Sequence, residues 1–305
     1  MKSKVTVDAP ASSANLGAGF DVFALALGRP KDRLTLDRAP TGIKLSVHGA
    51  KLPTTPKNNV VGAVARAIIS GEKVQAGVRM SLKKGVPVGS GLGSSAASSA
   101  AAVVGMNALF ELGLSNKKQI EYAGVGEELA SGTAHYDNVT ASLFGGFVLV
   151  SKDLSFIRMD PPHGLFLCLV IPKFKLPRLK TRYARSLLPK LLPLDDAVDA
   201  VSAAGKMVHG LADRSVDEFG AAMNGGFADS YRSVMILGFD RVKKAALENG
   251  AAGVCISGAG PAVLAATKKS RANSVLEAMT SSFESEGLRS DGFITTVGEG
   301  CRVIE

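Results

Sequence analysis

The chain has 305 residues, with 36 Lys and Arg against 27 Asp and Glu, which gives a formal net charge of +9. A basic balance of this size first suggests nucleic acid or another polyanion as a partner. Hydrophobic residues make up 46% of the sequence and charged residues 21%, a composition that is typical of globular proteins and excludes disorder as the main state. The length predicts two domains, or one fold with two lobes.

The sequence carries no sign of a membrane span or of export. The longest apolar run, residues 165–171, is far shorter than the roughly 18 residues of a membrane helix, and the N-terminus lacks an apolar signal core. Cys168, Cys255 and Cys301 are widely separated and form no CxxC pattern. They predict reduced thiols in a cytoplasmic protein with no membrane partner.

Strand and helix patterns are mixed along the whole chain. In the first half, alternation predicts strands around residues 5–7, 43–47, 78–82 and 147–150, and helical spacing predicts helices over 59–70, 94–112 and 115–130. In the second half, strands are predicted at 165–171, 252–257 and 262–266, and helices at 195–211, 241–248 and 272–286. This mixture is as compatible with an α+β architecture of mostly antiparallel sheets as with a doubly wound one. The pattern is interrupted at Pro161 and Pro162, which predicts that the boundary between the two domains lies between residues 150 and 165.

The segment from Val86 to Ala97 carries the strongest chemical signal. Gly89, Gly91 and Gly93 let backbone N–H groups point inward and form an anion-binding concavity. The two serines and the alanines that follow begin a helix, whose N-terminus offers unpaired donors and a positive dipole end. A phosphate site is therefore predicted, and it differs from the GxxxxGK[ST] and GxGxxG types, which are both missing.

Residues 87–97 resemble the phosphate loop of the GHMP small-molecule kinases. Residues 9–21 are similar to the first motif of that family, and residues 256–261 resemble its glycine-rich third motif. The resemblance implies an α+β fold of two lobes. Its N-terminal, ATP-binding lobe is of the ribosomal protein S5 domain 2 type, over residues 1–160, and its C-terminal lobe, over residues 161–305, is ferredoxin-like. The active site is expected between the two lobes.

Within that family, the segments around His135 and over residues 181–185 resemble the homoserine kinases. Asn138 stands where mevalonate-type members are expected to have an aspartate base. Ala18 and Ser230 depart from the usual prolines at backbone-stiffening positions. The resemblance implies ATP-dependent phosphorylation of the hydroxyl of L-homoserine, a step toward threonine, by a homodimer.

The same resemblance implies residues for ATP and for Mg²⁺. ATP is expected to bind the phosphate loop, which comprises Pro87, Val88, Gly89, Ser90, Gly91, Leu92, Gly93, Ser94, Ser95, Ala96 and Ala97. Ser95 and Glu127 are expected to hold Mg²⁺, and Glu128 is the neighbouring carboxylate that could be confused with Glu127. Asn59 and Val60 resemble the adenine-side segment, although a helix cap explains Asn59 equally well.

For the acceptor, the resemblance implies that Arg185 and Arg232 bind the carboxylate and that Asp21 binds the ammonium. The substrate-binding residues are expected to be Asn15, Asp21, His135, Asn138, Arg185, Arg232 and Gly258, and the catalytic ones Asn138, Arg185 and Thr181. His135 has a supporting role. No general base stands out, so the γ-phosphate itself is expected to accept the hydroxyl proton while Asn138 orients the nucleophile.

Three alternatives stay open. A basic polyanion or nucleic-acid binder is disfavoured because Trp is absent and aromatic residues are 6% of the chain. A relative that phosphorylates mevalonate or another hydroxy acid is not excluded by the paired arginines, and a non-catalytic nucleotide-binding homologue is disfavoured by Ser95 and Glu127.

Seven basic residues between Pro172 and Leu194 predict a local field for ATP and a carboxylate substrate, namely Lys173, Lys175, Arg178, Lys180, Arg182, Arg185 and Lys190.

Overall fold

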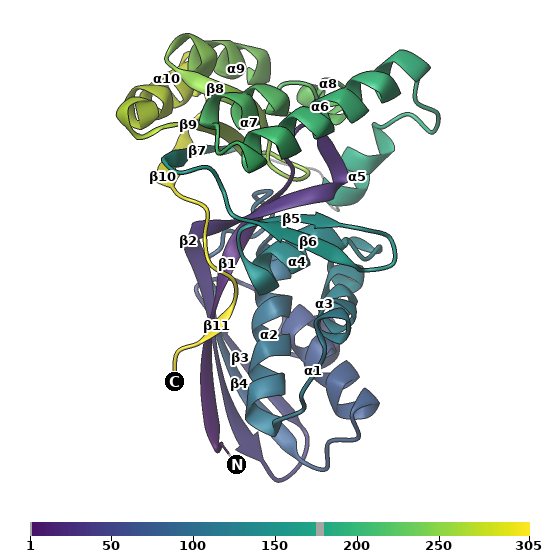
Figure 1. Ribbon diagram of the computed structural model, residues 1–305. Coiled ribbons are helices and arrows are strands. Elements are labelled where there is room, and N and C mark those ends of the chain that lie inside the picture. Colours follow the sequence, from purple (N-terminus) through teal and green to yellow (C-terminus); the bar gives the residue numbers. More distant parts are fainter. Residues whose placement is uncertain (1, 175–179) are drawn as a thin grey trace.

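The computed structural model describes residues 2–174 and 180–305. The chain forms two parts, each built from a sheet with helices packed on it (Figure 1). The N-terminal strands and helices form one part, and the second sheet with the later helices forms the other. The short helices α5 (Lys180–Ser186) and α8 (Phe227–Arg232) bring residues of the second part to the junction.

The first sheet is almost entirely antiparallel. Its path is β11-β1-β2-β4-β3, and β5 pairs with β2 and β6; only β3 and β4 run parallel among the described strands. The strands are β1 (Lys4–Asn15), β2 (Gly19–Ala39), β3 (Ile43–His48), β4 (Gly77–Lys83), β5 (Phe147–Val150), β6 (Phe156–Met159) and β11 (Arg302–Val303).

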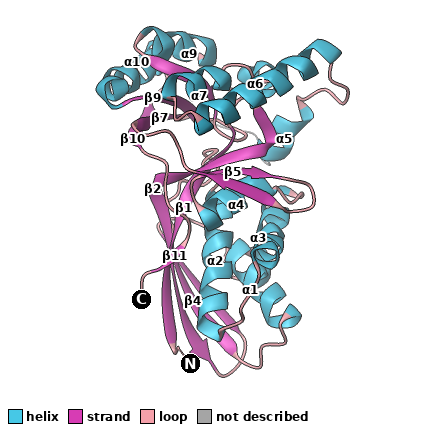
Figure 2. Ribbon diagram, viewed as in Figure 1, coloured by secondary structure: helices cyan, strands magenta, loops and turns pink. Residues whose placement is uncertain are grey.

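Helices cover one face of this sheet (Figure 2). They are α1 (Val60–Gly71), α2 (Ser94–Phe110), α3 (Asn116–Ser131) and α4 (Tyr136–Phe144). Helix α2 packs directly on β1 and β2, and its alanines, apart from the partly buried Ala108, are fully buried. Small side chains let the helix lie close to the sheet, which fixes the position of its N-terminus.

The second sheet has the order β10-β7-β9-β8 and is antiparallel throughout. Its strands are β7 (Leu165–Pro172), β8 (Ala251–Ile256), β9 (Val263–Lys268) and β10 (Ser290–Thr295). Leu167 and Leu169 face the core shared with Phe219, whereas Cys168 and Val170 face a second core with Met279. Because both faces are buried, β7 has a continuous apolar run instead of alternation.

Helices lie on both faces of the second sheet. On one side are α6 (Leu194–Ala212) and α7 (Val216–Met223), and on the other α9 (Phe239–Glu248) and α10 (Ala272–Ser285). Three short 3-10 helices complete the described elements, at Pro56–Asn58, Ser233–Met235 and Lys269–Arg271. None of the helices in the described ranges is long and apolar enough to cross a membrane.

The elements predicted from periodicity are all present, and the α+β architecture is confirmed over the doubly wound alternative. Strand β2 was not predicted at all, because Gly28 and Pro30 interrupt its pattern although the strand continues through them. The division at residue 160 stays a prediction. Strand β11, near the C-terminus, lies in the first sheet beside β1.

Candidate active site

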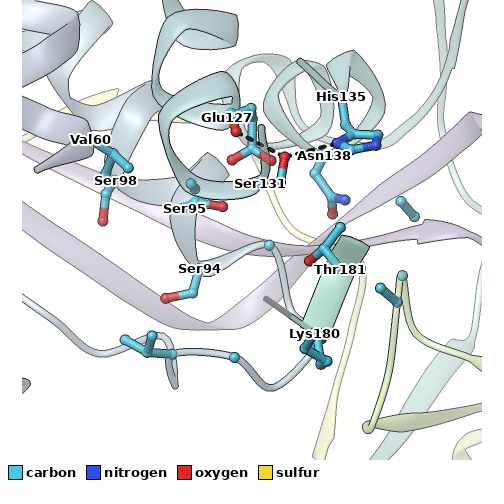
Figure 3. Close-up of a pocket in the computed structure, with 18 of the residues that line it drawn as sticks. Val60, Ser94, Ser95, Ser98, Glu127, Ser131, His135, Asn138, Lys180 and Thr181 are labelled. Carbon is cyan, nitrogen blue, oxygen red and sulfur yellow. Dashed lines mark hydrogen bonds between the residues drawn. The ribbon is translucent and has the colours of Figure 1, made fainter. Parts of the chain in front are cut away.

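A cavity of about 660 Å³ lies where the three glycine-rich segments meet. Its size is within the usual range of small-molecule sites. The lining comes from both parts of the chain, including the end of β1, the phosphate loop, α3, α4, α5 and the loop after β8. Figure 3 shows Ser94, Ser95, Glu127, Asn138 and Thr181 around this space.

The phosphate loop ends at an open helix N-terminus. Gly93 is the N-cap of α2 and adopts the left-handed conformation, with no side chain capping the helix. The Ser94 hydroxyl donates to the Val86 carbonyl at 3.0 Å and therefore does not cap the helix either. The first N–H groups of α2 thus remain available to an anion, and the helix dipole favours one there.

Two glycines of this loop allow close packing that any side chain would prevent. A Cβ on Gly91 would lie 2.5 Å from the Ser257 carbonyl oxygen, and one on Gly93 would lie 2.2 Å from Ser12 Oγ. Both residues also have positive φ angles, which glycine adopts without strain. The loop is therefore held between β1 and the segment after β8.

Hydrogen bonds join the same three segments. Ser12 N–H donates to the Leu92 carbonyl at 3.1 Å, and Ser257 Oγ donates to the Gly91 carbonyl at 2.9 Å. Gly258 N–H donates to the Ala14 carbonyl at 3.1 Å. These bonds explain why motifs that are far apart in sequence form one site.

A buried ion pair lies beneath the phosphate loop. The side chains of Lys84 and Asp32 are 2% and 0% exposed and bind each other. Asp32 also accepts from the N–H groups of Gly85 and Val86, both at 3.0 Å, and from Ser98 Oγ at 2.7 Å. Lys84 Nζ donates to Ser98 Oγ and, at 2.9 Å, to the carbonyl of the first residue of α2. This fully hydrogen-bonded network fixes the loop relative to α2.

Glu127, on α3, lies next to the start of α2. Its carboxylate is buried, and Oε1 has no hydrogen-bond partner. Burial raises the pKa of Glu127 to about 7, while a hydrogen bond from Ser95 opposes the shift and the charge of Asp137 adds to it. Glu128 is exposed, so Glu127 is the carboxylate of this pair that lines the cavity.

Ser95 and Glu127 fit a divalent cation that also binds phosphate. A hydroxyl and a carboxylate are oxygen ligands of the kind Mg²⁺ prefers, and Mg²⁺ is usually held by one or two protein groups together with phosphate oxygens. The unpaired Oε1 is the observation that supports such a ligand. Within residues 2–174 and 180–305, no group of three His, Cys, Asp or Glu side chains could hold a metal by itself.

Asn138, on α4, lies against the phosphate loop. Its Oδ1 accepts a hydrogen bond from Ser12 Oγ at 2.9 Å, which directs the amide N–H₂ group away from Ser12. Asp137 accepts from Asn138 N–H at 2.7 Å and also lines the cavity. Burial raises the pKa of Asp137 to about 7. Two adjacent residues thus present an amide and a carboxyl that can hold a proton at neutral pH.

An ion pair also lines the cavity. Arg185 on α5 donates to both carboxylate oxygens of Asp21, with Nη2–Oδ2 at 2.5 Å and Nη1–Oδ1 at 3.2 Å. Arg185 Nη1 also lies 3.2 Å from His135 Nε2. Burial and the nearby arginines lower the pKa of His135, and the Asp21 charge opposes this shift. The hydrogen bond to Asp21 raises the pKa of the Arg185 guanidinium, so the arginine stays charged.

Arg232 lies beside this pair and is only 5% exposed. Its Nη1 donates to the Gly258 carbonyl at 3.1 Å, and the guanidinium lies 5.1 Å from the centre of the Phe20 ring. Burial lowers the pKa of Arg232. Asn15 Nδ2 donates to the same Gly258 carbonyl at 2.9 Å, and Asn15 Oδ1 accepts from Asp21 N–H at 3.0 Å.

The residues predicted for the site lie in different positions relative to the cavity. All the predicted acceptor residues line it, as do Val88, Gly89, Gly91, Gly93, Ser94, Ser95, Glu127 and Thr181. By contrast, the buried side chains of Leu92, Ala96 and Ala97 support the loop from within the core, and Pro87 and Ser90 are also outside the lining. Asn59 lines the cavity and caps α1, because its Oδ1 accepts from Val61 N–H at 3.0 Å.

Sequence reasoning missed Ser12, Asp32, Lys84 and Asp137 as residues of the site. Asp32 and Lys84 lie outside the family-like segments, and no local pattern connects them. Of the basic stretch, Lys180, Arg182 and Arg185 line the cavity, whereas Lys173 pairs with Asp291 on the surface and Lys190 is exposed. Lys175 and Arg178 lie outside the described residues.

Comparison with known proteins places this geometry in a family. The GHMP kinases N terminal domain matches residues 58–146, and the GHMP kinases C terminal domain matches residues 207–285. Homoserine kinase of Halorubrum lacusprofundi is 40% identical over 303 residues, which cover 99% of each chain. Homoserine kinase of Methanocella arvoryzae is 38% identical over 302 residues, covering 98% of this chain and 97% of that protein.

Solved structures agree with this assignment. The crystal structure of homoserine kinase from Cytophaga hutchinsonii matches with a TM-score of 0.92 and 36% identity, over 100% of this chain and 98% of that one. L. major mevalonate kinase matches with a TM-score of 0.75 over 98% of each chain, and its 15% identity supports a common fold only. The cavity, its open helix N-terminus and these matches together show that the chain belongs to the GHMP kinase family.

Proposed function

We propose that this chain is a homoserine kinase, which transfers the γ-phosphoryl group of ATP to the hydroxyl of L-homoserine and releases ADP and O-phospho-L-homoserine. The observation that carries the proposal is the ion pair of Asp21 and Arg185 in the lining of the cavity. A free amino acid carries both an ammonium and a carboxylate, so it can bind both members of such a pair. The similar homoserine kinases support the same acceptor, and the product would lead toward threonine.

In this proposal, the amino acid replaces the ion pair between Asp21 and Arg185 with two new pairs, one to each residue. Its carboxylate binds Arg185 and Arg232 through charge-assisted hydrogen bonds, for which the guanidinium fork is suited. Its ammonium binds Asp21, which Asn15 holds through the Asp21 backbone. His135 keeps Arg185 in place through its Nε2.

In the same cavity, the triphosphate of ATP binds the phosphate loop and the N-terminus of α2. Ser95 and Glu127 would hold Mg²⁺, which neutralises phosphate charge when bound. The unpaired buried oxygen Oε1 of Glu127 supports this choice. Phosphoryl transfer needs positioning and charge stabilisation more than covalent chemistry by the protein, and both are provided by groups along this wall of the cavity.

Asn138 orients the acceptor hydroxyl. Because Ser12 occupies its Oδ1, the amide N–H₂ group is the part that can donate to the hydroxyl oxygen. The oxygen attacks the γ-phosphorus while the bond to ADP breaks, and the hydroxyl proton passes to a phosphoryl oxygen. Thr181, which also lines the cavity (Figure 3), would hydrogen-bond the group in transfer.

Replacing Arg185 with alanine is expected to raise the KM for L-homoserine by about 10²-fold, because it removes a charged hydrogen bond of about 1.5–3 kcal/mol to the carboxylate. The KM for ATP should change little, since Arg185 lies at the acceptor end. Steady-state kinetics with each substrate varied in turn measure both constants. Arg241→Ala is the control, because Arg241 pairs with Glu286 on the surface of α9. An unchanged KM for L-homoserine in Arg185→Ala would refute the carboxylate assignment.

An acceptor screen separates this function from its nearest alternative. The purified chain is given ATP, Mg²⁺ and either L-homoserine, mevalonate or shikimate, and ADP release is measured. Turnover of L-homoserine alone agrees with the proposal, whereas turnover of mevalonate alone favours a mevalonate-type kinase. Because the proposed reaction involves neither nucleic acid nor a membrane, activity is expected without either.

We also propose that the protein is a homodimer that packs through α6. Leu194, Val198 and Val201 are 79%, 59% and 74% exposed, and their spacing places them on one face of the helix. The mass in solution is expected to be about twice that of one chain, and Val198→Asp should give monomers. A monomeric wild-type protein would contradict this proposal.

The cytoplasm is the proposed compartment. All three cysteines are free in the structure, and two of them are buried. Burial raises the pKa of each thiol above its ordinary value, which keeps the thiols protonated and unreactive. Reduced cysteines and a supply of ATP are both conditions of the cytoplasm.

A further inference from the structure

Lys180, the first residue of α5, has no role in the function described above. It lines the same cavity, and its Nζ donates to the Gly260 carbonyl. None of the acidic side chains in the described part of the chain forms an ion pair with it. A lysine with only a carbonyl partner in a polar cavity is available to an anionic ligand.

The Gly260 carbonyl places this lysine at the phosphate loop. A Cβ on Gly91 would lie 2.6 Å from the Gly260 oxygen, so the two backbones are in direct contact. The ammonium of Lys180 therefore lies next to the middle of the loop. Thr181 follows in the chain, and Arg185, five residues further along the same helix, reaches the acceptor end. Figure 3 shows Lys180 beside Thr181 in the lining of the same pocket as Ser94 and Ser95.

The electrostatic surroundings of Lys180 favour an anion. Burial, together with the positive charge of Arg232, lowers the pKa of its amine to about 7. A buried ammonium is costly unless an anion compensates for the lost water. Phosphate oxygens would supply that compensation and would keep the lysine protonated.

We propose that Lys180 binds the γ-phosphoryl group of ATP and stabilises its charge during transfer to the acceptor hydroxyl. The inference deepens the proposed kinase function and rests on it. As the bond from the acceptor oxygen to phosphorus forms and the bond to ADP breaks, Lys180 donates hydrogen bonds to the phosphoryl oxygens and keeps its own proton. The hydroxyl proton still passes to a phosphoryl oxygen.

Three variants test the role of Lys180. Lys180→Met removes the charge but keeps most of the side-chain volume, Lys180→Arg keeps the charge, and Lys190→Met is the control from the exposed part of the same basic stretch. Calorimetry with Mg²⁺ measures the binding of ADP and of AMPPNP, an ATP analogue that retains a γ-phosphoryl group. Steady-state kinetics measure kcat and the KM for ATP.

For Lys180→Met we expect kcat/KM for ATP to fall by about 10²-fold, as for the loss of one charge-stabilising donor. AMPPNP binding should weaken by about 10-fold or more while ADP binding stays the same. Lys180→Arg should recover most of the lost activity. Lys190→Met should resemble the wild type in all three measurements.

Two results would overturn the proposal. If Lys180→Met weakened ADP and AMPPNP equally, the lysine would only support the loop. If Lys180→Arg were as inactive as Lys180→Met while AMPPNP bound normally, the lysine would act as a base in its neutral form. The binding measurements need no acceptor, so a failure of the wild type to phosphorylate L-homoserine would be recognised separately as a failure of the proposed function.

Discussion

Glu127→Gln is expected to lower kcat by about 10²–10³-fold at saturating ATP, the size found when one preorganised charge-stabilising group is removed from an active site. The carboxylate is buried beside Ser95 with Oε1 unpaired, so a bound cation would stabilise its charge. Glutamine keeps the shape but not the charge. Kinetics over a range of Mg²⁺ concentrations should show a higher requirement for the metal.

The same substitution should not destabilise the fold. The folded-state pKa of Glu127 is raised to about 7 from 4.5, so the ionised carboxyl lowers stability as the pH rises from about 4.5 through 7. Glutamine removes this cost. The Tm of Glu127→Gln is therefore expected to equal or exceed that of the wild type at pH 8, with less advantage at pH 5. Glu128→Gln, on the exposed side of α3, should leave kcat and Tm unchanged; equal kcat values for the two variants would refute the metal assignment.

Asp32→Ala is expected to lower the free energy of unfolding by about 3–5 kcal/mol, the usual cost of removing one member of a buried ion pair. It leaves Lys84 without its carboxylate and the N–H groups of Gly85 and Val86 without their acceptor. Because Lys84 also binds the first turn of α2, nucleotide affinity should fall as well. Urea unfolding measures the stability change.

Asp217→Ala is the matched control for that loss. Asp217 pairs with Lys268 on the surface, where both side chains are more than half exposed, and such pairs contribute about 0–1 kcal/mol. In the double variant Asp32→Ala/Lys84→Met, the loss should be smaller than the sum of the two single losses, since no buried charge remains unpaired. A loss below 1 kcal/mol for Asp32→Ala would contradict the role given to this network.

The phosphate loop was predictable because its information is local. Glycines that permit positive φ, followed by small helix-forming residues, determine both the loop and the open N-terminus of α2 without help from distant parts of the chain. The buried strand β7 was predictable for a similar reason, since its apolar run records that both of its faces are covered.

The rest of the site depends on contacts between distant residues, which no local pattern specifies. Asp32 binds Lys84 from a neighbouring strand, and Ser12 fixes the amide of Asn138 from another element. The resemblance brought Asp21 and Arg185 together in one site but did not predict that they pair with each other. That pairing follows from the position of α5 over β2, which only the folded chain reveals.

The identity of the product tests the central claim most directly. The purified wild-type chain, incubated with ATP, Mg²⁺ and L-homoserine, is examined by phosphorus NMR and by mass spectrometry. The account predicts one O-phospho-L-homoserine for each ADP formed, and no such product without the amino acid. ADP formation without a phosphorylated amino acid, or no reaction with L-homoserine at all, would contradict it.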